Sequence, residues 1–183
     1  AARLDLDQSL ADAPFLAVGD LDDRTGGARV FLAAPLDAEE VASLFADQIV
    51  EEEVVAWDAR AGRVAATQVR RLGAVVLSEA PIRQPAPHLV TAGLVEGIRQ
   101  KGADALPWTK DTRRLRERMA FLHHHLGAPW PDVSDAALLD TLSDWLGPYL
   151  AGMSRLSDLT RLDLGMVLGQ LGPPGARGEL GRL

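Results

Sequence analysis

The spacing of hydrophobic residues in the first part of the chain predicts short β-strands around one helix. Apolar runs at residues 15–18 and 29–33 flank a segment rich in Asp and Gly, which indicates an antiparallel pair joined by a loop. Asp37 is a suitable N-cap for a helix whose apolar positions recur at helical spacing up to Ile49. Residues 54–77 predict a three-stranded meander. Five strands and one helix favour a small twisted antiparallel sheet or a partly open barrel.

The hydrophobic pattern changes from strand-like to helical near residue 80. Pro81, Pro85 and Pro87 mark a stiff boundary between the two patterns. Beyond them apolar residues recur every three or four positions, and Thr109 and Ser134 are suitable N-caps. The last helical stretch is expected over residues 156–171. The chain is therefore predicted to be α+β, with a β-rich subdomain at residues 1–80, a helical subdomain at 81–172 and a loose tail at 173–183.

The amino-acid composition excludes several classes of protein and of functional site. The 183 residues are 47% hydrophobic and 25% charged, which is typical of a globular protein. The absence of cysteine excludes disulfides, thiolate zinc sites and cysteine nucleophiles. The formal net charge is −7, so a nucleic-acid contact requires a local basic face. No apolar stretch is long enough to span a membrane and no signal peptide opens the sequence, so we expect a cytoplasmic location and no membrane partner.

The familiar catalytic and cofactor motifs are missing from the sequence. Neither the P-loop pattern nor the G-x-G-x-x-G pattern occurs, so we expect no cofactor site and no catalytic residue in this chain. Residues 123–125 are three consecutive histidines, and successive helical side chains point about 100° apart, so they cannot converge on one metal. The acidic pairs at Asp22–Asp23 and in residues 51–53 indicate solvated loops or strand ends rather than a hydrolytic site.

Four arginines and one tryptophan of the predicted meander form the candidate nucleic-acid site. Arg60 and Arg63 flank a turn of the meander, and Arg70 and Arg71 lead into its next strand. On a small barrel these arginines would form a basic face that follows a phosphate backbone. Trp57 would then be placed to stack on a base.

The alternative interpretation makes the same residues structural. Acidic neighbours at Glu51, Glu52 and Asp58 would pair with the arginines as ordinary surface charges. Trp57 would then be a core residue, as large aromatic side chains usually are. Sequence chemistry by itself favours this alternative.

Several strings of the sequence resemble the region that follows the motor in bacterial HrpB-type ATP-dependent helicases, which are DEAH/DExH-box proteins. The strings comprise residues 33–36, 53–64, 71–79, 103–108, 115–118, 130–135 and 144–150. The resemblance as a whole runs from about Ala13 to Leu171, which is most of the chain. The strings are long and unusual in combination, so the resemblance is specific.

The resemblance implies that the chain is the C-terminal accessory region of an ATP-dependent RNA helicase. The RecA-like motor, which uses ATP and Mg²⁺, would lie upstream in the same polypeptide, and this region would not be catalytic alone. An OB-like barrel in such a region would guide nucleic acid or regulate the motor, although the helix after the second strand departs from the usual order. Family members continue into a further β-rich end, so the native C-terminus is expected beyond residue 183.

Two classes of function remain open. One is an accessory module whose partners are the upstream motor and single-stranded RNA. The other is a structural or protein-interaction module that docks on the motor or a partner without contacting RNA. The acidic net charge favours the second, whereas the arginines and the resemblance favour the first; a free-standing enzyme is the weakest class. Phosphate contacts predict a steep loss of affinity with salt, and apolar docking does not.

Overall fold

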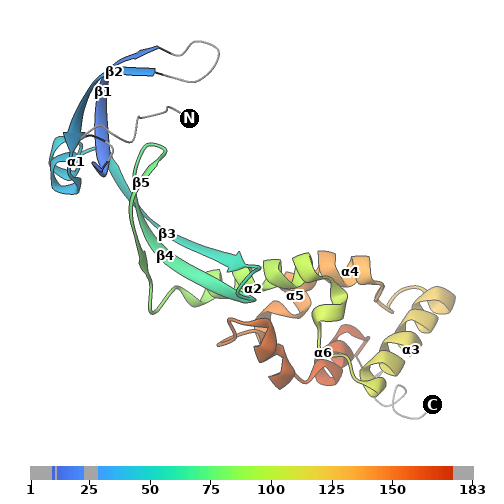
Figure 1. Ribbon diagram of the computed structural model, residues 1–183. Helices are drawn as coiled ribbons and strands as arrows, with labels where there is room; N and C mark the ends of the chain where they lie inside the picture. The colour runs from blue at the N-terminus through green and yellow to red at the C-terminus, as the bar shows by residue number, and fades with distance from the viewer. Residues whose placement is uncertain (1–9, 11, 23–28, 175–183) are drawn as a thin grey trace. The chain divides into compact units, whose positions relative to one another are not determined.

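The computed structural model describes residues 10, 12–22 and 29–174 of the chain. Its strands precede most of its helices, which confirms the predicted α+β class (Figure 1). The chain divides into two compact units. The first, called here the strand unit, comprises residues 1–52 and 68–80, and the second, the helical unit, comprises residues 53–67 and 81–183. The predicted turn at residues 23–28 and most of the predicted tail, residues 175–183, lie outside the described residues.

The strand unit begins with an antiparallel pair. Strand β1 (Phe15–Asp22) pairs with β2 (Arg29–Leu36), and the register is irregular on both sides of Asp20. Helix α1 (Ala38–Leu44) follows directly. Its predicted N-cap is confirmed, because the Asp37 carboxylate accepts hydrogen bonds from the backbone N–H groups of the first turn.

The predicted meander is confirmed as an antiparallel sheet in the order β3 (Ile49–Asp58), β4 (Arg63–Leu72) and β5 (Val75–Pro81). Gly62 and Gly73 close its two turns with φ of 63° and 57°, a left-handed conformation that favours glycine. Among the described residues the strands form separate sheets of two and three strands rather than one barrel. A barrel requires the outer strands to pair with one another, and no such pairing occurs in this part of the chain.

The helical unit contains short helices around one apolar core. They are α2 (Pro87–Lys101), η1 (Ala103–Ala105), α3 (Lys110–Leu126), α4 (Asp135–Asp140), α5 (Leu142–Trp145), η2 (Gly147–Tyr149), η3 (Leu156–Arg161) and α6 (Leu164–Leu171). Thr109 and Ser134 cap α3 and α4 as predicted, each accepting a backbone N–H. The single helix expected over residues 156–171 is instead two, because Leu162 is extended and Asp163 caps a new helix.

Fully buried side chains from most of these helices meet in one cluster. Leu94 and Ile98 of α2, Met119 of α3, Leu146 and Leu168 are among its members, each with no exposed surface. A fully buried aliphatic side chain contributes about 1.5–3 kcal/mol, so this cluster is the main source of stability in the helical unit. Within the described part of the chain, no helix has both the length and the hydrophobicity needed to cross a bilayer.

Candidate nucleic-acid interface

The structure divides the five predicted contact residues between the two units. Arg70 and Arg71 lie on the part of β4 that belongs to the strand unit. Trp57, Arg60 and Arg63 lie in the part of the meander that belongs to the helical unit. We therefore describe the two groups separately.

Arg70 and Arg71 both pair with carboxylates on the neighbouring strand β3. Arg70 Nε lies 3.0 Å from Glu51 Oε1, and Arg71 Nε donates a hydrogen bond to Glu52 Oε1. Successive residues of a strand point to opposite faces of the sheet, so the two guanidinium groups do not share one surface. The alternative interpretation, in which the arginines are ordinary surface charges, predicts ion pairs with Glu51 and Glu52, and both are present.

Trp57 packs against helix α2. A Cβ atom added to Gly97 would lie 2.3 Å from Cδ2 of the Trp57 indole, so the ring rests directly on the helix backbone. Trp57 also belongs to the partly buried hydrophobic residues around the helical core. Within the described residues its Nε1 is buried without a hydrogen-bond partner. The ring thus fixes the β3–β4 hairpin to the helical unit, and its face toward α2 is closed to a base.

Backbone hydrogen bonds hold the tip of this hairpin against the segment before η3. The Val64 N–H donates to the Ser154 carbonyl at 2.8 Å, and the Leu156 N–H donates to the Gly62 carbonyl at 3.3 Å. These bonds make Arg63 and Arg155 directly opposed residues of an antiparallel bridge. Opposed residues project from the same face with Cβ atoms about 4.5–5.5 Å apart.

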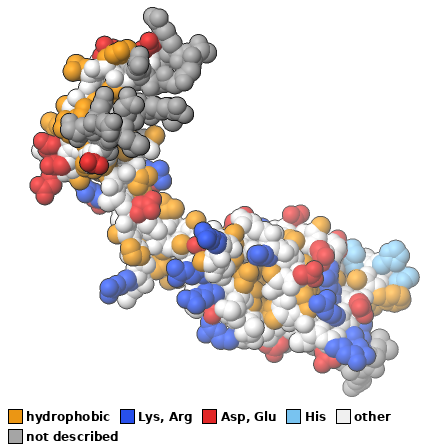
Figure 2. Space-filling model, in the orientation of Figure 1, with side chains coloured by type: hydrophobic (Ala, Val, Ile, Leu, Met, Phe, Trp, Pro, Cys, Tyr) orange, Lys and Arg blue, Asp and Glu red, His pale blue; other side chains and the backbone are white. Residues whose placement is uncertain are grey.

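A compact turn places a third arginine beside this pair. The Asp58 carboxylate accepts hydrogen bonds from the backbone N–H groups of Arg60 and Ala61, and Arg60 is exposed. We call Arg60, Arg63 and Arg155 the hairpin patch. All three side chains are exposed, and among the described residues no ion pair joins any of them to a carboxylate. Figure 2 shows Lys and Arg side chains gathered on the helical unit near this hairpin.

The carboxylate of Asp158, three residues after Arg155, is already engaged. Asp158 Oδ2 accepts the N–H groups of Ser154 and Arg155, each at 3.0 Å, and its Oδ1 lies 3.0 Å from Arg161 Nη2. The Ser154 N–H is the main reason that the pKa of Asp158 lies below its ordinary value, and the charges of Arg161 and Arg155 add to the effect. Asp158 therefore fixes the backbone that carries Arg155.

The sequence did not point to Arg155 as a member of this group. Arg63 and Arg155 are far apart along the chain, and only the β-bridge between them brings the two together. The spacing of residues along the sequence indicates contacts within one helix or one hairpin only, so it could not indicate a contact between Arg63 and Arg155. An extended Arg155 before η3 marks the segment that makes the bridge.

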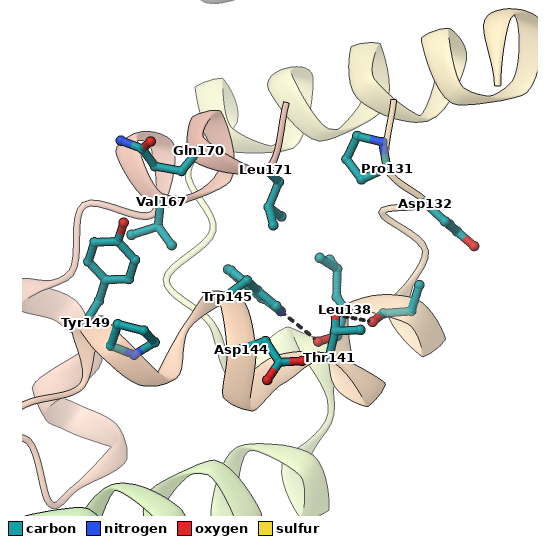
Figure 3. A pocket seen from close by; sticks show the side chains of 12 residues that line it. Pro131, Asp132, Leu138, Thr141, Asp144, Trp145, Tyr149, Val167, Gln170 and Leu171 are labelled. Atoms are coloured by element: carbon teal, nitrogen blue, oxygen red, sulfur yellow. Dashed lines mark hydrogen bonds between the residues drawn. The ribbon is translucent and has the colours of Figure 1, made fainter. Parts of the chain in front are cut away.

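A groove on the helical unit is the second surface feature. Its volume is about 680 Å³, and Figure 3 shows Leu138, Trp145, Val167 and Leu171 directed toward it. The Trp145 Nε1–H donates to the Leu138 carbonyl at 2.9 Å, which fixes the indole. The charged side chains among its lining residues are both acidic, Asp132 and Asp144. This chemistry suits an apolar group flanked by positive charge.

The three histidines at the end of α3 do not converge on one point. His123 Nδ1 lies 2.8 Å from the Trp130 carbonyl oxygen, whereas the His124 and His125 rings contact each other. Within the described ranges, no group of three His, Cys, Asp or Glu side chains is placed to hold a metal ion.

The meander that carries the predicted site is similar to a region of known proteins. Residues 48–82 match the family model described as ATP-dependent RNA helicase HrpB, connector region. These residues contain the whole β3–β5 meander and all five residues of the predicted site. The ATP-dependent RNA helicase HrpB of Escherichia coli (strain K12) is 30% identical over 142 residues, which are 77% of this chain and 18% of that protein.

Two crystal structures of E. coli proteins are similar to the chain. The DExH-box NTPase HrpB aligns with a TM-score of 0.53 and 28% identity, covering 98% of this chain and 22% of that one. The DEAH/RHA helicase HrpB aligns with a TM-score of 0.53 and 25% identity, covering 98% and 23%. The chain thus spans about a fifth of the length of the relatives it matches.

Proposed function

The chain corresponds to a region of HrpB-type DExH helicases, and we propose that it is an accessory region that contacts the RNA strand through the hairpin patch. In this proposal the ATP-hydrolysing motor is another part of the same polypeptide. The chain itself binds neither ATP nor Mg²⁺. Its task is to hold the phosphate backbone of a strand that the motor moves.

The observation that carries the proposal is that Arg63 and Arg155 oppose each other across a β-bridge, and that no ion pair joins either of them or Arg60 to a carboxylate among the described residues. Like charges placed opposite each other across a β-bridge repel and destabilise the pairing. Arg63 and Arg155 nevertheless occupy such positions, with Arg60 at the adjacent turn. A bound phosphate removes this repulsion, and guanidinium groups bind phosphate oxygens in bidentate fashion.

The remaining predicted residues take smaller parts in the proposal. Arg70 and Arg71 act as secondary phosphate contacts, since each must first exchange its carboxylate on β3 for a phosphate. Trp57 positions the hairpin by packing on Gly97, rather than offering that face of the ring to a base. The proposed site therefore differs from the five-residue site expected from the sequence by the addition of Arg155.

The test is RNA binding by charge-matched variants. Fluorescence anisotropy with a labelled single-stranded RNA is measured at about 50 and 200 mM salt, a range over which multi-phosphate contacts lose much of their affinity. We expect the triple variant Arg60→Ala, Arg63→Ala, Arg155→Ala to bind at least about tenfold more weakly at the lower salt. Its slope of log affinity against log salt should fall by about 2, the value for three lost phosphate contacts on a single strand.

The control removes the same charge from elsewhere on the helical unit. Lys101, Lys110 and Arg114 are exposed, so their triple alanine variant changes the net charge equally. We expect this control to keep RNA affinity within about twofold of the parent and to leave the salt slope unchanged. Equal losses in the two triple variants, or unchanged binding by the hairpin variant, would contradict the proposal.

The second candidate function is a module that docks on a protein without contacting RNA. The groove favours it, because its apolar lining and its acidic residues Asp132 and Asp144 suit a peptide with apolar and basic side chains. The same titration separates the two candidates. Absence of RNA binding even at low salt, in the parent chain and in every variant, would favour protein docking.

A further inference from the structure

The strand unit leaves most of its large hydrophobic side chains open to solvent. Among the described residues, ten large hydrophobic side chains are exposed, and seven of them lie in the strand unit, including Val18, Phe31, Leu32 and Val75. The same unit contains only two of the buried hydrophobic residues of the described chain, Val41 and Val69. Large contiguous apolar surface is rare on soluble monomers, and where it occurs it marks an interaction site.

The β1–β2 ribbon carries three of these exposed side chains, Val18, Phe31 and Leu32. Phe31 lies at the irregularity of the ribbon, next to Leu32, because Leu32 pairs with Asp20 and Val30 with Leu21, which leaves Phe31 without a paired residue on β1. The exposed fractions of Phe31 and Leu32 are 61% and 65%. Val18, on β1 and paired with Ala33, is exposed as well. Large apolar side chains on both strands of the two-stranded ribbon therefore reach solvent.

A two-stranded ribbon of this kind lacks the third strand or the packed face that would stabilise it. Two strands without a covering layer are marginally stable in water, and a third strand or a packed face is needed for independent stability. Each strand of the ribbon pairs only with the other among the described residues, so each also keeps one unpaired edge. An exposed apolar strand edge is a template for pairing with another segment.

We infer that another segment of the same helicase polypeptide, outside residues 1–183, covers the exposed apolar side chains of the β1–β2 ribbon. The inference rests on the proposed placement of the chain within a longer helicase, and it does not require RNA contact. In the relatives, the matching region makes up about a fifth of one continuous polypeptide. The other four fifths are therefore covalently linked to it. A segment tethered in this way acts at an effective concentration in the millimolar range, far above that of a second copy.

Site-specific photo-cross-linking in the full-length helicase tests this inference. The photoreactive analogue p-benzoylphenylalanine replaces Phe31 in one sample and Phe121 in the matched control. Phe121 lies on α3 of the helical unit and has nearly the same exposed fraction, 63% against 61% for Phe31. After irradiation without RNA, cross-linked peptides are identified by mass spectrometry.

We expect the analogue at position 31 to form cross-links to peptides outside residues 1–183, in a product that migrates as one chain. The control at position 121 is expected to give at least about tenfold less of such cross-links. Cross-links between two chains, cross-links confined to residues 1–183, or no cross-link at position 31 would overturn the inference. Because RNA is absent from the experiment, its failure is distinct from a failure of the RNA-binding test.

Discussion

The two units of the molecule differ in how they use their hydrophobic residues. The helical unit contains 17 of the 19 buried hydrophobic residues in the described part of the chain, and the strand unit contains two. Short amphipathic helices can turn their apolar faces toward one centre and satisfy their own backbone hydrogen bonds. A two-stranded sheet has two faces and two edges, which it cannot cover by itself. The helical unit is therefore the self-sufficient part, and the strand unit is the part that needs a partner surface.

This difference also separates the two proposed roles. The hairpin patch is attached to the self-sufficient unit, because Val64 and Leu156 bind the hairpin tip and the segment before η3 to each other. A rigid base is what a set of phosphate-binding arginines requires. The apolar ribbon lies in the strand unit and serves attachment rather than RNA contact. Substitutions in the two units should consequently have different effects.

The largest expected contrast comes from matched leucine truncations. Leu146→Ala removes a fully buried side chain from the helical core and should cost about 2–5 kcal/mol of unfolding free energy. Leu32→Ala removes an exposed side chain of β2 and should change the stability of the 183-residue chain by less than about 0.5 kcal/mol. Urea denaturation followed by circular dichroism measures both values. Similar losses for the two variants would remove the contrast between the units.

The next largest effect concerns the attachment of the hairpin to α2. Gly97→Ala places a Cβ atom 2.3 Å from the Trp57 ring, so the hairpin or the helix must shift, at an expected cost of about 1–3 kcal/mol. Gly169→Ala in α6 is the control, because no atom lies within 4 Å of its added Cβ. That variant should be stabilised by about 0.5–1 kcal/mol through higher helix propensity. Thermal unfolding followed by tryptophan fluorescence distinguishes them, and a neutral Gly97→Ala would refute the close packing of Trp57.

A smaller effect concerns Asp158 and pH. Its native pKa is lowered, chiefly by the Ser154 N–H, so its contribution to stability is complete above the ordinary carboxyl pKa. The contribution is lost as the pH falls through the native pKa. Asp158→Asn keeps an oxygen that can accept the N–H groups but loses the charge, so it should cost less than about 1 kcal/mol at neutral pH and almost nothing at a pH below the native pKa of Asp158. Denaturant titrations of parent and variant at several pH values check this, with exposed Asp140→Asn as control. A cost that does not depend on pH would contradict the assigned cause.

The local features of the fold were predictable from the sequence because they depend on neighbouring residues. The change from strands to helices near Pro81 follows from hydrophobic spacing. The caps at Asp37, Thr109 and Ser134 follow from side chains that accept nearby N–H groups. The resemblance of residues 53–64 and 71–79 to HrpB-type helicases lies within the region that the family model matches.

The features that the sequence did not reveal are contacts between distant segments. The separation of the strands into two sheets depends on which edges pair, and local patterns do not encode that choice. The bridge between Arg63 and Arg155 depends on the final path of the chain, so the hairpin patch was only partly predicted. The break at Leu162 was missed because apolar residues continue through it at helical spacing. Gly93 and Gly97, two glycines inside helix α2, lie where Val64 and Trp57 of the hairpin approach the helix closely.

Hydrogen–deuterium exchange is the most direct measurement of the difference between the two units. Amide exchange is compared between the 183-residue chain and the full-length helicase that carries it. We predict that the amides of β1 and β2 exchange markedly more slowly in the full-length helicase, because another segment covers them there. The amides of α2, α5 and α6 should exchange at the same rate in both. Equal exchange of β1 and β2 in the two proteins, or protection of α2, α5 and α6 that appears only in the full-length helicase, would contradict the division into a self-sufficient and a dependent unit.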